Sequence, residues 1–184
     1  MGNNEVKFER AIFAGGCFWC MEPPFKKLDG VVSVTSGYTA GKRENPTYQE
    51  VCTGLTGHTE AIEIVYDPTR VSYKELLDLF WMNIDPTDGG GQFFDRGSQY
   101  RSGIYYFNEE QKQQAERSKQ QLEESGRYDD PVVTEIVAAT RFYPAEDYHQ
   151  DYSKENPVRY NSYRSGSGRD RYLDKVWGAE RKKH

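Results

Sequence analysis

Apolar and polar residues follow short, regular patterns along most of the chain, and these patterns predict both strands and helices. The clearest strand is 59–66, where Ile62, Ile64 and Tyr66 fall on one face and Ala61, Glu63 and Val65 on the other. Short apolar runs bounded by turn residues predict four further strands, at 8–14, 31–36, 102–107 and 132–139.

Two helices carry clear start signals. Ser72 is followed three positions later by Glu75, which is a capping box, and apolar residues then recur at helical spacing as far as Ile84. Asn108 is a typical N-cap for a polar helix that runs to about Ser125. With a helix expected after the first strand, the order is β-α-β-β-α-β-α-β. This order predicts an α+β sandwich, a mixed sheet with helices mainly on one side.

Three stretches lack a regular pattern. Residues 37–47 are polar and predict a loop, and residues 85–101, with three successive glycines, are expected to be functional or disordered. The segment 165–168 is typical of a flexible hinge, followed by a terminal helix over 169–183 that docks through its apolar residues. We expect one domain over 1–184, with about 143–184 as an extended C-terminal segment packed on the core.

Composition excludes several classes of function. The chain has 184 residues, with 24 Lys and Arg against 29 Asp and Glu, so it has no general attraction for nucleic acid or anionic lipid. No apolar run approaches the length of a membrane span, and the N-terminus lacks an apolar signal segment. Three cysteines are too few for a disulfide scaffold. We therefore expect a cytoplasmic protein with one functional pair of cysteines.

The most informative motif is Gly15-Gly16-Cys17-Phe18-Trp19-Cys20, directly after the first strand. Paired glycines allow a sharp turn, which places Cys17 in the first turn of a helix. The unpaired N–H groups and positive dipole at that helix end favour a thiolate. Cys20 lies one turn later on the same side, close enough to form a disulfide. The motif predicts a redox pair in which Cys17 is the nucleophile.

Two alternatives for these cysteines stay open at this point. Both side chains can simply be buried on a helix face, as free cysteines often are. Zinc is the other alternative, because Cys17, Cys20, Cys52 and His58 supply four ligands, although their spacing lacks a second tight pair. The corresponding functions are a thioredoxin-class oxidoreductase, for which the Phe18-Trp19 spacer lacks the proline, and a zinc-stabilised binding module.

Other residues are candidates for a site around the thiols. Phe18 and Trp19 either pack in the core or form an apolar box suited to a methyl or thioether group. Glu60 shares the apolar face of its strand, so it either lies at the rim or is buried. A buried carboxyl has a raised pKa and can donate a proton near neutral pH.

Loop residues add weaker candidates. Tyr48, Asp95 and Tyr100 lie where side chains can converge on a cleft, although each alone is more often a surface or turn residue. Nothing around His149 suggests a catalytic triad. Phosphate-binding and dinucleotide-binding glycine motifs are absent from the sequence, which favours thiol chemistry without a cofactor.

These residues fall in sequence blocks that resemble those of the A-type peptide methionine sulfoxide reductases. The matching blocks, in chain order, are 15–19, 45–52, 56–61, 95–102 and 148–152 with 156–157. The resemblance covers nearly the whole chain and implies a ferredoxin-like α/β sandwich with loop elaborations. It also implies repair of oxidised proteins and reduction of free methionine sulfoxide, for the S-epimer.

The resemblance implies a role for each candidate. Cys17 attacks the sulfoxide sulfur and becomes a sulfenic acid, while Glu60 protonates the oxygen. The residues implied to support this step are Tyr48 and Tyr100 as hydrogen-bond donors, Phe18 and Trp19 as the methyl box, and Asp95 and Tyr152 as the polar side of the pocket.

Recycling is where this chain departs from many relatives, which have glycine at position 20 and recycling cysteines in a C-terminal tail. The tail here has none. The resemblance therefore implies that Cys20 attacks the sulfenic acid and that thioredoxin, or dithiothreitol in an assay, reduces the Cys17–Cys20 disulfide. Cys52 is the alternative resolving thiol. We expect no metal and no other cofactor.

Overall fold

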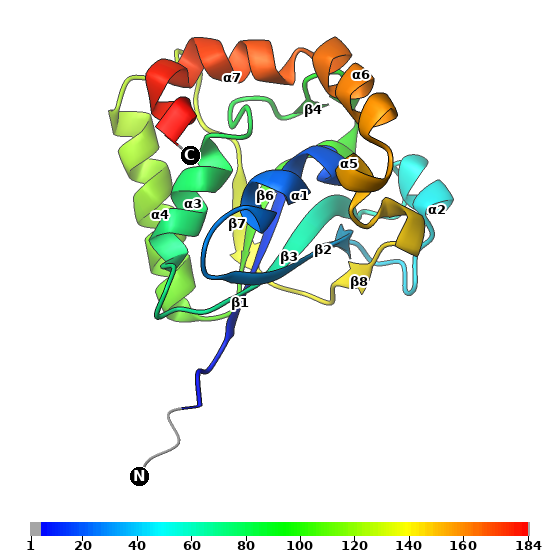
Figure 1. The fold of residues 1–184 in the computed structure, drawn as a ribbon, viewed down its shortest axis with the longest axis horizontal. Helices are drawn as coiled ribbons and strands as arrows, with labels where there is room; N and C mark the ends of the chain where they lie inside the picture. Colours follow the sequence, from blue (N-terminus) through cyan, green and yellow to red (C-terminus); the bar gives the residue numbers. More distant parts are fainter. Residues whose placement is uncertain (1–4, 184) are drawn as a thin grey trace.

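The computed structural model describes residues 5–183, and its centre is a six-stranded sheet with the strand order β7-β6-β1-β3-β2-β8 (Figure 1). The strands are β1 Glu9–Gly15, β2 Val31–Thr39, β3 Thr59–Tyr66, β6 Ser102–Tyr106, β7 Glu135–Ala138 and β8 Tyr143–Pro144. Only β6 and β7 pair in parallel, and the other neighbours are antiparallel. The predicted α+β class with a mixed sheet is confirmed.

The middle of this sheet has the ferredoxin-like arrangement. Helix α1 (Phe18–Lys26) connects β1 to β2, and α3 (Tyr73–Trp81) connects β3 to β6. The strand order β6-β1-β3-β2 is that of a βαββαβ unit, to which β7 and β8 add one edge strand each. Helix α4 (Glu109–Glu124) packs beside α3 and β6.

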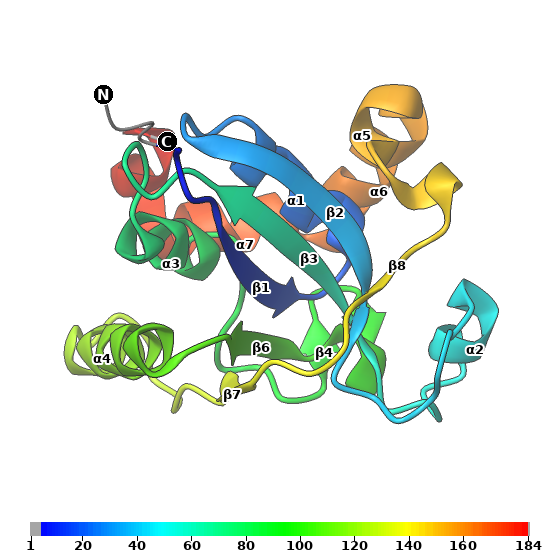
Figure 2. The same cartoon turned by 90° about the horizontal axis from the view of Figure 1, so that it is seen from below.

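The main core lies between the sheet and the helices, because alternate residues of β1 and β3 point toward α1 and α3. Phe13 of β1 stacks on Phe80 with ring centroids 4.9 Å apart and also meets Phe25. A smaller apolar cluster on the opposite face contains Ile12 and Tyr105. The segment between β7 and β8 crosses that face and covers it, as Figure 2 shows.

Local signals account for several element ends. Ser72 and Glu75 form the predicted capping box, with Ser72 Oγ accepting from Glu75 N at 3.1 Å and Glu75 Oε2 accepting from Ser72 N at 2.8 Å. Asn108 caps α4 as predicted. A second capping box, Thr47 with Glu50, starts the short helix α2 (Tyr48–Cys52), which was not predicted.

The aperiodic stretch 85–101 is ordered, not disordered. It forms a hairpin of β4 (Gly91–Gln92) and β5 (Asp95–Arg96), followed by the 3-10 helix η1 (Ser98–Tyr100). A Cβ on Gly91 would lie 2.2 Å from the carbonyl oxygen of Asp95, so the turn needs glycine at this position. Strands of two residues are too short to produce a periodic pattern.

The C-terminal segment is helical and packs over the helix side of the sheet (Figure 1). Its elements are η2 Asp147–His149, α5 Tyr152–Glu155, α6 Pro157–Ser167, α7 Arg169–Trp177 and η3 Gly178–Lys183. The expected flexible hinge at 165–168 is wrong, because these residues form the last turn of α6 and its left-handed cap at Gly168, with φ +80°. Ser167 Oγ fixes this corner by donating to Arg164 O at 2.7 Å and accepting from Arg169 N at 3.3 Å.

The terminal helix is also shorter than expected. Helix α7 ends at Trp177, where Gly178 has φ +53°, and a 3-10 helix follows. Within residues 5–183, none of the helices is both long and apolar enough to span a membrane.

Leu173 tests how firmly α7 is attached to the body of the protein. Its side chain is 0% exposed, so Leu173→Ala should lower the free energy of unfolding by about 2 to 4 kcal/mol through lost burial and a cavity. Leu55 is 88% exposed, and Leu55→Ala should change it by less than about 0.5 kcal/mol. Urea denaturation of both variants measures the difference. Equal stabilities would contradict a packed C-terminal segment.

Candidate active site

The turn between β1 and α1 positions Cys17. Gly16 has φ +86°, and a Cβ at this position would lie 2.6 Å from Gln92 Cβ, so both the backbone conformation and the space require glycine. Cys17 is the N-cap residue of α1, and its carbonyl accepts from Cys20 N at 3.0 Å. The structure therefore places both cysteines at the start of this helix, as the spacing predicts.

The two thiols influence each other's ionisation and are not equivalent. Burial raises the pKa of Cys17 well above its usual value, and Cys20, Glu60 and Asp95 raise it further. The pKa of Cys20 is lowered to about 6, chiefly by the hydrogen bond with Cys17 and then by the positive charges of Arg169 and Arg164. Of the two thiols, Cys20 is therefore the more readily ionised.

This difference goes against the expectation that the helix start favours a thiolate on Cys17. The Cys17 residue is only 6% exposed. The helix N-terminus favours a thiolate there, but loss of hydration and nearby acidic groups oppose it more strongly. Its neighbourhood is nevertheless polar, because two acidic side chains and a second thiol act on it.

Glu60 is buried on β3, on the face that carries Ile62 and Ile64, so the rim alternative does not apply. The residue is 2% exposed, and its Oε1 accepts from the backbone N–H of Phe18 at 3.2 Å. Burial raises the pKa of Glu60 to about 8 despite that hydrogen bond. At neutral pH the carboxyl is mostly protonated beside the helix start that carries Cys17.

Two tyrosines surround this carboxyl. Tyr48 begins α2 and Tyr100 ends η1, and both are half-buried. Burial raises the pKa of each phenol, and the charge of Glu60 raises both further, so the hydroxyls remain neutral donors. Asp95 of β5 accepts a hydrogen bond from Tyr163 of α6, and burial raises its pKa. Three loop candidates therefore meet near Glu60.

Of these groups, Tyr48 and Tyr163 line a cavity of about 800 Å³, whereas Cys17 and Glu60 are not among its lining residues. The aromatic residues that line it are Trp19, Tyr48, Phe94, Tyr148, His149, Tyr152 and Tyr163. Trp19 stacks flat on Tyr152, with ring centroids 3.7 Å apart and planes 7° apart. Phe18 is buried, and its ring packs against those of Tyr38 and His149. The cavity suits a small apolar group with a polar end.

Sequence reasoning missed His149, which is buried within this aromatic group. Its Nδ1 accepts from Trp19 Nε1 at 3.1 Å, and its ring lies 4.4 Å from that of Tyr48. Burial lowers the pKa of His149, so the ring is neutral and can act as the acceptor that orients Trp19. No local pattern announces this role, because Trp19 and His149 lie far apart in the sequence.

The four possible zinc ligands do not come together. The His58 ring is engaged elsewhere, with Nδ1 accepting from Gly41 N at 3.1 Å and Nε2 lying 2.6 Å from Arg43 O, and Cys52 is exposed on α2. Within the described part of the chain, no group of three or more His, Cys, Asp or Glu side chains is arranged to hold a metal ion.

Two buried thiols at one helix start, a buried carboxyl with a raised pKa and an aromatic cavity on a ferredoxin-like sheet define a thiol-dependent oxidoreductase. The family model described as "Peptide methionine sulfoxide reductase" matches residues 9–181. The chain belongs to this family, and the expected family resemblance is confirmed.

Individual proteins agree with the family match. The chain is 56% identical over 172 residues to the peptide methionine sulfoxide reductase MsrA of Bacillus licheniformis. The aligned region covers 94% of this chain and 95% of that protein. Reduced Mxr1 from Saccharomyces cerevisiae is similar in structure, with a TM-score of 0.78 and 31% identity over 85% of this chain and 90% of that chain. Mxr1 from Saccharomyces cerevisiae in complex with Trx2 shares the fold, with a TM-score of 0.58 and 22% identity. The match covers 83% of this chain and 89% of that chain.

The protonation of Glu60 has a consequence for stability. Because its folded-state pKa is raised from 4.5 to about 8, the folded protein holds a proton that the unfolded chain releases, and this group makes stability fall as pH rises between those values. Glu60→Gln removes the effect. The free energy of unfolding should be measured by urea denaturation at pH 5 and pH 8. As pH rises, that of the variant should increase relative to that of the wild type by about 1 kcal/mol or more per pH unit. Exposed Glu44, changed to Gln, is the control. A difference that does not vary with pH would contradict the buried acid.

Proposed function

We propose that this chain reduces the S-epimer of methionine sulfoxide, free and in proteins, through a Cys17 sulfenic acid and a Cys17–Cys20 disulfide. The observation that carries the proposal is the protonated carboxyl of Glu60, buried against the helix start that bears Cys17. A sulfoxide oxygen is a poor leaving group unless it is protonated, and Glu60 supplies that proton near neutral pH.

In the reductive step the substrate enters the aromatic cavity with its methyl group against Trp19 and Tyr152. Cys17 attacks the sulfoxide sulfur as its thiol proton is lost to water, and Cys20 keeps its own ionisation state for the later step. Glu60 protonates the oxygen, and the neutral hydroxyls of Tyr48 and Tyr100 donate hydrogen bonds to it. The oxygen is transferred to Cys17, methionine leaves, and Cys17 becomes a sulfenic acid. Asp95 with Tyr163 forms the polar side of the pocket.

In the recycling step Cys20 attacks the sulfenic sulfur. The S–S bond forms, the S–O bond breaks, and the oxygen leaves as water after protonation. The position of Cys20 in the same helical turn as Cys17, with Cys20 N donating to Cys17 O at 3.0 Å, supports Cys20 as the resolving cysteine, whereas Cys52 is exposed on α2. Thioredoxin is the proposed reductant of the disulfide. The solved complex of Mxr1 with Trx2 supports this choice of partner.

The remaining expectations fit the same proposal. Residues 1–184 act as one domain, since helices from 143–184 supply His149, Tyr152 and Tyr163 to the cavity. All three cysteines are unpaired, which is the usual state in a reducing compartment and supports a cytoplasmic protein. The chemistry needs only thiols and a carboxyl, so we propose no metal or bound cofactor.

Single cysteine variants test the order of events. Cys17→Ser should release no methionine from a chiral sulfoxide substrate, because the attacking sulfur is gone. Cys20→Ser should release about one methionine per protein and then stop with thioredoxin as reductant, because the sulfenic acid has no partner. Cys52→Ser is the matched control and should turn over like the wild type.

Quenched-flow chromatography of released methionine, with mass mapping of the oxidised cysteines, makes the comparison. Substantial turnover by Cys17→Ser would refute the mechanism. Normal thioredoxin-dependent turnover by Cys20→Ser, with loss of turnover in Cys52→Ser, would transfer the recycling role to Cys52.

Glu60→Gln tests the proton donor directly. The amide keeps the shape but has no acidic proton, so single-turnover release of methionine should slow by about 100-fold or more at neutral pH. In the wild type the rate should fall as pH rises through about 8, where the carboxyl ionises, and the variant should lose this dependence. An unchanged rate in Glu60→Gln would exclude Glu60 as the acid.

A further inference from the structure

Arg169, the first residue of α7, is a fully buried cation that forms no ion pair with a carboxylate within the described residues, although Asp95 interacts with it electrostatically. It is 1% exposed, and it donates to Asn83 O at 2.7 Å and to Gly15 O at 3.0 Å. Its guanidinium also lies over the Phe93 ring, 4.7 Å from the centroid. Among the described residues, no ion pair involves Arg169. A buried charge is costly unless an anion compensates it.

The position of this cation points to the cysteine pair. Arg169 bonds to Gly15, two residues before Cys17, and its Nη1 lies 3.7 Å from the sulfur of Met21, the residue after Cys20. A Cβ on Gly16 would lie 2.9 Å from Arg169 Nη2, so the glycine leaves room for the guanidinium. Arg169 therefore lies against the turn and the first helical turn that carry both thiols.

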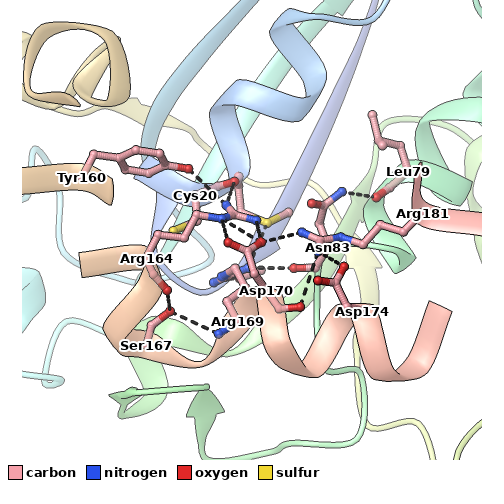
Figure 3. A network of polar contacts seen from close by, with 12 residues as sticks. Cys20, Leu79, Asn83, Tyr160, Arg164, Ser167, Arg169, Asp170, Asp174 and Arg181 are labelled. Atoms are coloured by element: carbon pink, nitrogen blue, oxygen red, sulfur yellow. Dashed lines mark hydrogen bonds and ion pairs between the residues drawn. The ribbon is translucent and has the colours of Figure 1, made fainter. Parts of the chain in front are cut away.

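A second arginine holds the helical turn of Cys20. Pro24 has no N–H, so the Cys20 carbonyl lacks its partner four residues ahead in α1. Arg164 Nη1 of α6 lies in that position and donates to Cys20 O at 3.4 Å. Arg164 also pairs with Asp170, 2.7 Å away, which in turn pairs with Arg181 (Figure 3). Arg169 forms no such ion pair, and the charge of Asp95 is the carboxylate charge that acts on it.

We propose that Arg169 is the counter-cation of the Cys20 thiolate, and that Arg164 positions the turn bearing it, so that the C-terminal segment keeps the recycling thiol ready to attack. The inference rests on the proposed function for the step that the thiolate performs. Arg169 is a positioning residue, because it acts through Cys20 and touches no substrate.

Charged and titratable groups reach Cys20 from every element around it. The cations are Arg164 and Arg169, and the acids are Glu60 on β3 and Asp95 on β5. Cys17, Tyr160 and Tyr163 are neutral neighbours. After the hydrogen bond from Cys17, the two arginines are what lower the pKa of Cys20, against the opposing effects of burial and Asp95. Above about pH 6 the thiolate predominates.

The thiolate matters in the recycling step. Cys20 S⁻ supplies the electron pair for the new S–S bond to Cys17, and the S–O bond of the sulfenic acid breaks with release of hydroxide, which takes up a proton to become water. A neutral thiol at Cys20 would first have to lose its proton inside a buried site. Removing the cation should therefore slow disulfide formation much more than the preceding release of methionine.

Arg169→Met and Arg169→Lys separate charge from shape in the full-length protein. The thiolate of Cys20 is read from absorbance at 240 nm between pH 5 and 8.5, as the difference between each protein and its Cys20→Ser counterpart. The midpoint should rise by about one pH unit or more in Arg169→Met and stay near the wild-type value in Arg169→Lys. Arg127→Gln is the control, because Arg127 also packs on α7, bonding to Val176 O at 2.9 Å.

A kinetic measurement follows the same variants. With one equivalent of methionine sulfoxide, disulfide formation in Arg169→Met should be at least about tenfold slower than in wild type at pH 6.5 and should recover at pH 9, where Cys20 ionises without help. Arg169→Lys should restore the rate at pH 6.5. A purely structural clamp would instead lower thermal stability in both variants without moving the titration.

An unchanged midpoint in folded Arg169→Met, or a lysine variant that titrates like the methionine variant, would overturn the inference. If Arg169→Met fails to fold, the test uses Arg164→Gln, because the Arg164 side chain is partly exposed, at 14%. The midpoint of the Cys20 titration must then rise in Arg164→Gln as well. The titration needs no substrate. A wild type that releases no methionine would refute the proposed function while leaving the titration interpretable.

Discussion

The site depends on one constraint, which is that two thiols and a carboxyl are removed from water together. Burial alone would keep Cys17, Cys20 and Glu60 all protonated, because each anion would lose its hydration. The interaction with Cys17 and the positive charges of Arg164 on α6 and Arg169 on α7 lower the pKa of Cys20 alone, so that this group can carry a negative charge. Glu60 retains its proton in the same environment. A dithiol exposed to solvent would have no such division of roles.

The C-terminal helices both shield the thiols from water and supply the positive charges next to them. They bring Tyr160 and Tyr163 next to the thiols, which reduces hydration, and they bring Arg164 and Arg169, whose positive charges lower the pKa of Cys20. The anchoring of α7 is therefore part of the electrostatics of the site. Arg169 contacts the end of β1 and the chain just after α3, so the cation is held by the same two elements that form the centre of the core.

Local sequence signals predicted the parts of the fold that local interactions determine. The capping box at Ser72, the alternation in β3 and the paired glycines each act within a few residues, and the structure has all three. The same alternation placed Glu60 on the apolar face of β3 but left open whether it is buried or at the rim, and the structure buries it. The hinge at 165–168 failed because Ser and Gly composition does not reveal that Ser167 bonds across the corner. His149 and Arg169 gave no signal, since their surroundings are assembled from distant segments. The ionisation of Cys17 was misjudged for the same reason, because a local helix dipole was outweighed by burial among β3, β5 and α6.

The two shifted groups support each other. The negative charge of Cys20 is one of the factors that raise the pKa of Glu60, so the thiolate that serves recycling also helps to keep the acid protonated for reduction. With midpoints near 6 for Cys20 and near 8 for Glu60, the thiolate and the protonated acid coexist in the interval between them. Formation of the disulfide removes that charge and lowers the pKa of Glu60 again. The acid therefore has its highest pKa when both cysteines are reduced, which is the state in which substrate binding leads to reaction.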